Sequence, residues 1–311
     1  MTVVIRDLRP ADPADVESVV RVRRAALPYL LSTPAGVAFE LAGANPAKRY
    51  RVLVAETADG RIVGTAQVGL AYDSPEPGRS FVNAYVDPAG RGLGAGSGLL
   101  AAAEAYLAGE GAAEVFAWVL DEPAYRAFAE RRGYRASRSA HFLRLDLAGG
   151  ALPPVPPLPA GVELRPASAF AADPRPLFEA DAETTADEPG DVEVEFDDYA
   201  DWVRHTWNNP DLDKELTTVA LVDGTVAAFT AALTDGAGRY ASGMTGTLRA
   251  FRGRGLAKLV KTASLHRARA AGYREAFTGN DTANAPMLAV NTWFGYEVCA
   301  TEVRYAKEIG K

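Results

Sequence analysis

Two glycine-rich stretches are the most informative part of this sequence: VDPAGRGLGAG at residues 86–96 and TLRAFRGRGLA at residues 247–257. Each lies between a segment patterned as a strand and a segment whose apolar residues recur at helical spacing. Glycine adopts positive φ without strain, so such a turn can direct several backbone N–H groups toward one point beside the positive end of a helix. The stretches therefore predict binding sites for a phosphate or pyrophosphate, with Arg91 and Arg252 adding positive charge.

The spacing excludes two other glycine motifs. Neither stretch contains the phosphate-loop pattern GxxxxGK[ST], and neither continues into the dinucleotide fingerprint, which places an acidic residue about 20 residues after its glycines. The alternative interpretation is that the glycines only let the helix pack close to the sheet. Two stretches at matching places in the chain favour ligand binding over this alternative.

The stretches are part of an internal repeat. Their arginines are 161 residues apart, and the Gly-Tyr pairs at 133–134 and 295–296 are 162 residues apart. Alternating segments around a tight glycine turn, typical of a hairpin, also correspond: VLVAETADGRIVGTAQV at 52–68 and TVALVDGTVAAFTAAL at 218–233. A period of this length predicts two copies of one domain rather than a solenoid.

The proline-rich segment AGGALPPVPPLPAG, at 148–161, divides the chain near its middle and predicts a stiff, extended linker. We therefore expect an N-terminal domain at 1–147 and a C-terminal, catalytic domain at 162–311. In each copy, hairpin strands precede a strand–loop–helix–strand unit. This order predicts an α/β fold with α+β layering, in which a mixed, mostly antiparallel sheet is flanked by helices.

The composition narrows the class of protein. The 33 basic and 40 acidic residues give a net charge of −7, so no nucleic-acid partner is expected. A single cysteine and three scattered histidines predict neither a disulfide framework nor a metal site. The absence of a long apolar run or signal peptide predicts a cytoplasmic protein without a membrane partner.

The glycine stretches resemble the acyl-CoA pyrophosphate loop of the GNAT acyltransferase superfamily, whose pattern is V-x-P-x-x-[RQ]-x-x-G-x-[GA]. The first half matches the pattern at Val86, Pro88, Arg91, Gly94 and Gly96. The second half matches at Arg252, Gly255 and Ala257, with Thr247 and Arg249 in place of the Val and Pro. The resemblance covers nearly the whole chain as a tandem pair, an arrangement shared with mycothiol synthase-like proteins.

The resemblance implies acetyl-CoA as the donor and a primary amine on a small molecule as the acceptor, with direct transfer between them. The donor-binding residues that it implies in the second half are Thr247, Leu248, Arg252, Gly253, Arg254, Gly255, Leu256, Ala257 and Asn284. Those in the first half are Val86, Arg91, Gly92, Gly94, Gly96 and Ser97. Asn284 also suits the N-cap of a helix beginning at 285–286, and the two roles are compatible.

The resemblance also implies that the second half is the catalytic one. Many relatives carry a tyrosine four residues before the closing Gly-[FY], where it protonates the leaving thiolate; the chain has Ala129 and Asn291 there. The second half keeps polar groups in TGNDTANAPMLAVNTWFGYEV, at 278–298, so Asn291 and Asn280 are the expected catalytic residues. In the family a backbone N–H of the strand before the loop stabilises the oxyanion, here around 84–86 or 245–248.

No general base can be read from spacing. The acidic run at 179–202 contains eleven carboxylates, and Asp187 and Glu188 are the first candidates for a base that also attracts a cationic amine. The alternative is a solvated, charged surface. Lys258 and Lys261 have two interpretations as well: contacts to the 3′-phosphate of coenzyme A, or the solvated face of their helix.

Two other functions stay open at this point. The missing tyrosine also fits a non-catalytic acyl-CoA-binding module, and an acyltransferase with a carrier-bound or tRNA-bound donor would use the same fold. The chain is expected to be a monomer or a homodimer.

Overall fold

A computed structural model describes residues 3–189 and 198–310. Within them the chain forms two compact units. The first contains residues 3–140 and 301–310, and the second contains residues 141–189 and 198–300.

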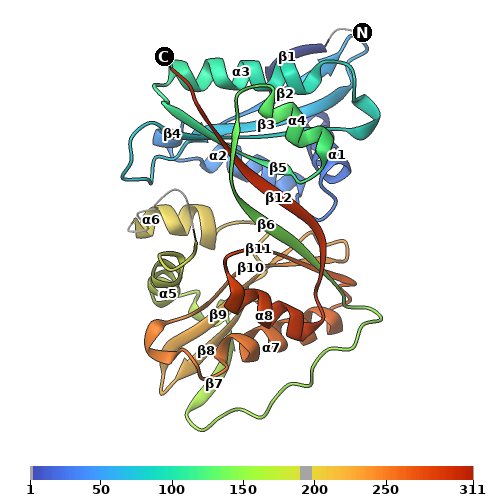
Figure 1. Cartoon of the computed structure of the whole chain (residues 1–311). Helices are drawn as coiled ribbons and strands as arrows, with labels where there is room; N and C mark the ends of the chain where they lie inside the picture. The colour runs from blue at the N-terminus through green and yellow to red at the C-terminus, as the bar shows by residue number, and fades with distance from the viewer. Residues whose placement is uncertain (1–2, 190–197, 311) are drawn as a thin grey trace. The chain divides into compact units, whose positions relative to one another are not determined.

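The first unit is a mixed sheet with helices on both faces (Figure 1). Its elements are β1 (Val3–Asp7), α1 (Pro13–Ala26), α2 (Pro34–Gly43), β2 (Arg51–Thr57), β3 (Ile62–Leu70), β4 (Arg79–Val86), α3 (Ala95–Gly109), β5 (Glu114–Leu120), α4 (Pro123–Glu130) and the start of β6 (Arg135–Asp146). The strands lie in the order β1-β2-β3-β4-β5, and only β4 and β5 are parallel. Helix α3 makes the crossover between these two strands, as a parallel pair requires.

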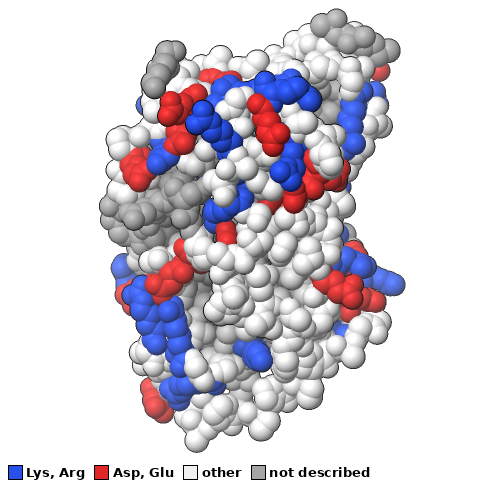
Figure 2. All heavy atoms as spheres, in the orientation of Figure 1, with Lys and Arg blue, Asp and Glu red and all other residues white. Residues whose placement is uncertain are grey.

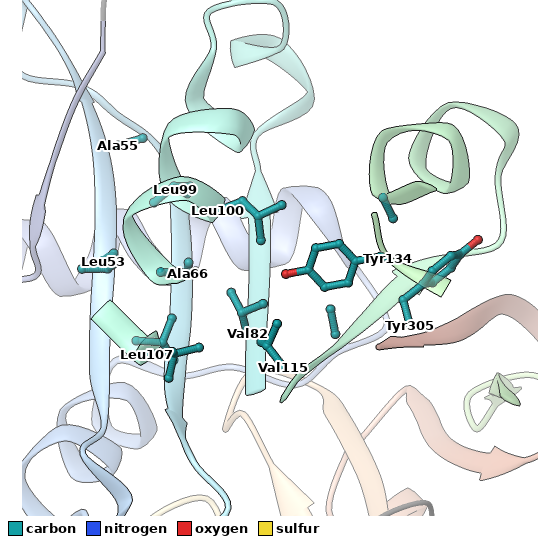
Figure 3. Close-up of a cluster of buried hydrophobic side chains, with 14 of the residues drawn as sticks. Leu53, Ala55, Ala66, Val82, Leu99, Leu100, Leu107, Val115, Tyr134 and Tyr305 are labelled. Atoms are coloured by element: carbon teal, nitrogen blue, oxygen red, sulfur yellow. The ribbon is translucent and has the colours of Figure 1, made fainter. Parts of the chain in front are cut away.

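Two apolar clusters cover the faces of this sheet. One cluster packs α3 onto the sheet and includes Leu99, Leu107 and Val115, all fully buried (Figure 3). The other packs α1 and α2 onto the opposite face and includes Val19 and Val54. Residues alternate between the two faces along each strand, so both faces of β2 are apolar.

The second unit repeats the order of the first. Its elements are β7 (Val162–Pro166), α5 (Arg175–Thr185), α6 (Tyr199–Trp202), β8 (Thr218–Val222), β9 (Thr225–Thr234), β10 (Arg239–Thr247), α7 (Leu256–Ala270), β11 (Glu275–Asp281), α8 (Ala285–Phe294) and the start of β12 (Glu297–Glu308). The strand order is β7-β8-β9-β10-β11, again with one parallel pair, β10 and β11. The predicted fold class is confirmed: each unit is a mixed, mostly antiparallel sheet flanked by helices.

The last strand of each sheet comes from an unexpected part of the chain. In the first unit, residues 302–308 of β12 pair with β5, and Tyr305 is fully buried in the core. In the second unit the end of β6 lies beside β11 and buries Leu143 and Leu145. The predicted domains, 1–147 and 162–311, differ from the two units in this respect, because residues 141–147 belong to the second unit and residues 301–310 to the first. The two strands are equivalent in the repeat, so their patterns do not say which copy completes which sheet.

The proline-rich segment lies within the second unit. Residues 151–159 form neither helix nor strand. The carbonyl oxygen of Pro153 accepts a hydrogen bond of 2.8 Å from Nε2 of His266 on α7, and Leu152 packs against the core. The segment is therefore attached to α7 along its path.

Basic and acidic side chains lie next to one another on the face shown in Figure 2. Among the described residues, no helix is both long and apolar enough to cross a membrane. In the same part of the chain, no group of three or more His, Cys, Asp or Glu side chains could hold a metal ion.

Candidate functional site

The parallel strands of the second unit separate toward their carboxyl ends. Strands β10 and β11 pair only over their first three residues, Arg239–Ala241 with Glu275–Phe277. Beyond them β10 runs to Thr247 and β11 to Asp281. Backbone N–H and C=O groups between the diverging strands are therefore available to a ligand, and the carboxyl ends of parallel strands are where ligands of α/β sheets bind. Strands β4 and β5 of the first unit separate in the same way after Phe81 and Phe116.

A β-bulge distinguishes the second unit. The pairing of β10 with β9 shifts between Ser242, which lies opposite Ala232, and Thr245, which lies opposite Thr230. Strand β10 therefore has one more residue than β9 in this interval. In the first unit, the ladder between β3 and β4 is continuous from Ser80 to Val86. A bulge removes one residue from the ladder and changes the direction of its backbone groups. The bulge thus frees backbone groups at the separating end of β10, next to residues 245–248, where an oxyanion donor is predicted.

Both glycine loops have the conformation that their sequences predict. Gly92 and Gly94 have φ of 82° and 81°, and Gly253 and Gly255 have φ of 76° and 75°. Helices α3 and α7 begin after Gly94 and Gly255, and no side chain caps either helix. A Cβ atom at any of these four glycines would meet nothing within 4 Å. Each loop therefore offers uncapped helix N–H groups to open space, as an anion site requires.

In the first unit, side chains of α4 and the turn after it reach the loop. The guanidinium of Arg91 lies 5.1 Å from the centre of the Tyr125 ring and donates to its hydroxyl. Ser97 Oγ accepts a 2.6 Å hydrogen bond from Arg132. Gly96 faces Phe128, 3.5 Å from the position of a Cβ. Val86 packs against the core cluster under α3.

In the second unit, the predicted donor residues differ in exposure. Arg252, Gly253, Arg254 and Gly255 are exposed, Thr247, Leu248 and Ala257 are half-buried, and Leu256 is buried in the core. Thr247 Oγ1 is buried without a hydrogen-bond partner in the described structure. An unpartnered buried hydroxyl at the end of β10 suits a ligand with polar groups.

Asp187 lies at this loop but in ion pairs. Its carboxylate accepts hydrogen bonds of 2.7 and 3.0 Å from Arg249, and a further one from Arg252. The hydrogen bonds from Arg249 and then Arg252 lower the pKa of Asp187 to about 2. A carboxylate with so low a pKa is a weak base, so the structure does not support proton transfer by Asp187. Its neighbour Glu188 is exposed.

Other residues of the acidic run have structural roles or lie outside the described residues. Asp181 is buried in α5, where Trp202 donates a 2.8 Å hydrogen bond from its indole and burial raises the pKa of the carboxyl. Asp198 caps α6 by accepting from the backbone N–H of Asp201. The carboxylates at 191, 193, 195 and 197 lie outside the described residues.

A buried polar chain lies behind the loop. Lys261 on α7 is fully buried, and its Nζ donates a 2.6 Å hydrogen bond to Oδ1 of Asn291 on α8. Nδ2 of Asn291 in turn donates to Oδ1 of Asn280 on β11. The two expected catalytic asparagines are thus in contact with each other. Asn284 is the N-cap of α8, where its side chain accepts from the backbone N–H of Met287 at 3.3 Å.

The position of Lys261 corrects an expectation. Both interpretations of this lysine assumed a solvated side chain, and the structure buries it completely. The sequence contains a signal for this burial, because Leu265 and Ala268 follow at i+4 and i+7 and share its face of the helix. Lys258 lies half-buried with Nζ 4.6 Å from the centre of the Trp293 ring.

The comparisons with known proteins agree with this geometry. The model of the Acetyltransferase (GNAT) family matches the chain twice, at residues 18–134 and 178–296. A mycothiol acetyltransferase of Nocardioides sp. is 30% identical over 268 residues, which cover 78% of this chain and 90% of the relative. A mycothiol acetyltransferase of Frankia alni is 35% identical over 150 residues, covering 48% of this chain and 43% of the relative.

Solved structures share the fold over the whole chain. A GCN5-related N-acetyltransferase from Sphaerobacter thermophilus has a TM-score of 0.71 at 21% identity and covers 98% of this chain and 95% of its own. A tandem GNAT protein from the clavulanic acid biosynthesis pathway also has a TM-score of 0.71, at 23% identity, with 99% of each chain covered. With two matches to the family model and this fold in both halves, the chain belongs to the GNAT acetyltransferase family as a tandem member.

Proposed function

We propose that the second unit transfers an acetyl group from acetyl-CoA to a primary amine of a small molecule. The observation that carries this proposal is the bulge in β10, which coincides with separating strands and an uncapped glycine loop only in this unit. The name of the Nocardioides relative supports acetyl as the group transferred and a small molecule as the acceptor.

Binding of the donor uses backbone more than side chains. The N–H groups of the loop and of the first turn of α7 would hold the pyrophosphate, and Arg249, Arg252 and Arg254 add positive charge around it. The unpaired backbone groups of β10 would bind the amide-containing arm that leads to the thioester. The donor supplies an activated acyl group, so the protein needs no covalent nucleophile.

The transfer itself requires positioning and charge stabilisation. The neutral amine attacks the thioester carbon, a C–N bond forms, and negative charge develops on the carbonyl oxygen. A backbone N–H at the bulge would stabilise this oxyanion. The C–S bond then breaks, its electron pair goes to sulfur, and the proton lost by the amine balances the proton that the thiolate gains. Glu188 remains the candidate for a base that removes the proton of the amine.

We assign a different role to the first unit. Its loop is intact, but its fourth strand has no bulge and Ala129 occupies the position of the usual acid. These features support binding of coenzyme A without transfer. The observation that neither unit has the tyrosine gives the second candidate function, an acyl-CoA-binding module without activity.

Calorimetric titration of acetyl-CoA, paired with a thiol-release assay over a panel of primary amines, tests the proposal. Gly255→Glu places a like charge at the pyrophosphate and should abolish turnover, whereas Gly94→Glu should leave it unchanged within a factor of about 2. Gly255→Ala is the matched control, because it carries the same backbone strain at positive φ without the charge. Turnover that survives Gly255→Glu but not Gly94→Glu would move the active site to the first unit. Donor binding without turnover of any amine would support the binding module instead.

A further inference from the structure

Lys261 is a buried cation without a counter-ion in the described structure. Its side chain is fully buried, and its Nζ lies 2.6 Å from Oδ1 of Asn291 and 5.0 Å from the centre of the Tyr296 ring. No carboxylate in the described residues forms an ion pair with it. Burying an amine in this way disfavours folding unless the amine stays neutral, so its presence calls for a functional reason.

The hydrogen bonds of Lys261 determine the orientation of two amides. A protonated lysine has only donors, so Asn291 must turn its oxygen toward Nζ and its NH2 group toward Asn280. Asn280 then accepts with its oxygen, which leaves its own NH2 group as the outer end of the chain. The three side chains therefore form a row of dipoles with the positive end toward Asn280.

This row ends at the separating strands. Asn280 lies three residues beyond Phe277, the last residue of β11 that pairs with β10. Asn291 stands where many relatives carry the tyrosine that protonates the leaving thiolate. The row thus joins a buried positive charge to the part of the second unit where the proposed donor would break its C–S bond.

We propose that Lys261 is a positioning residue that orients Asn291 and Asn280 toward the sulfur of coenzyme A and so stabilises the leaving thiolate. This inference rests on the proposed function of the second unit. When the C–S bond breaks, its electron pair goes to sulfur, and the N–H groups of the row and the lysine charge stabilise that negative charge. Water returns a proton to the thiolate later, so the row transfers no proton itself.

The charge of Lys261 depends on pH, because burial lowers its pKa to about 7. Strands β8 and β9 bring no titratable side chain to α7. The titratable and charged groups on the other neighbouring elements are Arg239, Tyr240, Glu275, Asp281 and Tyr296, together with Lys258, His266, Arg267 and Arg269 on α7 itself. Burial raises the pKa values of Tyr240 and Tyr296, so both phenols stay neutral. Glu275 pairs with Arg144. In the protein without ligand the lysine is therefore cationic below about pH 7, whereas a bound thiolate would keep the lysine protonated at higher pH, because the two opposite charges stabilise each other.

The test measures the ionisation of bound coenzyme A directly. The whole chain carrying Gly94→Glu, which blocks the first loop, is saturated with coenzyme A, and the ultraviolet thiolate band is followed against pH with the analogue that lacks the sulfur as the blank. Free coenzyme A, titrated in the same buffers, gives the reference pKa of the thiol. We expect the pKa of the bound thiol to be lower by about one unit, a tenfold gain in thiolate.

Three variants separate positioning from general electrostatics. Lys261→Met, nearly equal in volume and uncharged, should return the thiol pKa to that of free coenzyme A. Asn291→Leu keeps the lysine but breaks the row, and it should also abolish the shift; a charge that acts through space alone would preserve it. Lys307→Met is the control, because this lysine pairs with Glu104 in the first unit and should leave the shift intact. Thermal unfolding verifies that each variant is folded.

The possible results separate the role of Lys261 from the proposed function of the second unit. Coenzyme A that binds but titrates like the free thiol overturns the role of Lys261 and leaves the proposed function standing. A shift that persists in Lys261→Met or in Asn291→Leu also overturns it. Failure of the Gly94→Glu protein to bind coenzyme A, with wild type binding it, overturns both.

Discussion

The two units build the same loop and the same separating strands, yet they differ at three corresponding positions. In the second unit these positions hold Lys261, Asn280 and Asn291. Counting back 161 or 162 residues, the first unit has Leu100, Val119 and Ala129, and all three belong to the apolar cluster under α3. Leu100 belongs to the same buried cluster as Tyr134, and both are drawn in Figure 3.

The two units share the backbone of the loop, whereas the side chains behind the loop are specific to each unit. The glycine loops depend on backbone conformation, which a repeated sequence reproduces in both units. The side chains behind the loop can be exchanged between an apolar set and a polar set of similar volume. The polar set disfavours folding because it buries an amine, and the hydrogen bond from Lys261 to Asn291 offsets part of that cost.

Transplanting the lysine should have the largest effect on stability. We expect Leu100→Lys to reduce the free energy of unfolding of the first unit by about 3–5 kcal/mol, because the amine would enter an apolar cluster where the carboxylate at i+4, Glu104, already pairs with Lys307. Leu100→Met, which conserves volume, should cost less than about 1.5 kcal/mol. Urea unfolding measures both variants. Equal stabilities would mean that the first unit tolerates the charge and that the two units differ less than their side chains indicate.

The exchanged strands β6 and β12 should each stabilise the unit whose sheet they complete. Tyr305→Ala should reduce the stability of the first unit by about 3–5 kcal/mol, although the residue lies near the end of the chain, because its ring fills that core. Leu143→Ala is the counterpart and should destabilise the second unit by about 2–5 kcal/mol. Hydrogen exchange locates the loss. Faster hydrogen exchange of the second unit in Tyr305→Ala, or of the first unit in Leu143→Ala, would contradict the strand assignment.

The stability of the second unit should depend on pH through Lys261. Its pKa is about 7 in the folded chain and about 10.4 when unfolded, so between these values the unfolded chain binds a proton that the folded chain lacks. Stability contributed by this lysine therefore increases with pH, by about 2 kcal/mol from pH 7 to pH 9. The measurement is the difference between wild type and Lys261→Met in urea at the two pH values. A difference that stays constant would show that the lysine is solvated.

Asp187→Asn should have the smallest effect. The change frees Arg249 and Arg252 for the pyrophosphate, so acetyl-CoA should bind the second unit a few times more tightly, and less so at high salt. Turnover should change by no more than a similar factor, since a carboxylate of such low pKa is a poor base. A fall in turnover of a hundredfold would restore Asp187 as the base.

The repeat, the fold class and the two loops were predictable from the sequence. Each depends on local rules: glycines at positive φ before a helix, alternation in a hairpin, and apolar residues at helical spacing. The pairing of Asn280 with Asn291 was expected only as two polar residues in one half, and the N-cap role of Asn284 followed from the proline two residues later.

Features that depend on contacts between distant parts of the chain were not predictable from the sequence. The exchange of β6 and β12 was not readable because equivalent strands carry equivalent patterns. Asp187 forms ion pairs with Arg249 and Arg252, which lie 62 and 65 positions further along the chain. These pairs make the candidate base a residue that holds two arginines in place. The burial of Lys261 depends on α8 and the sheet closing over it, because a lysine on a helix is solvated until a neighbouring element removes the water.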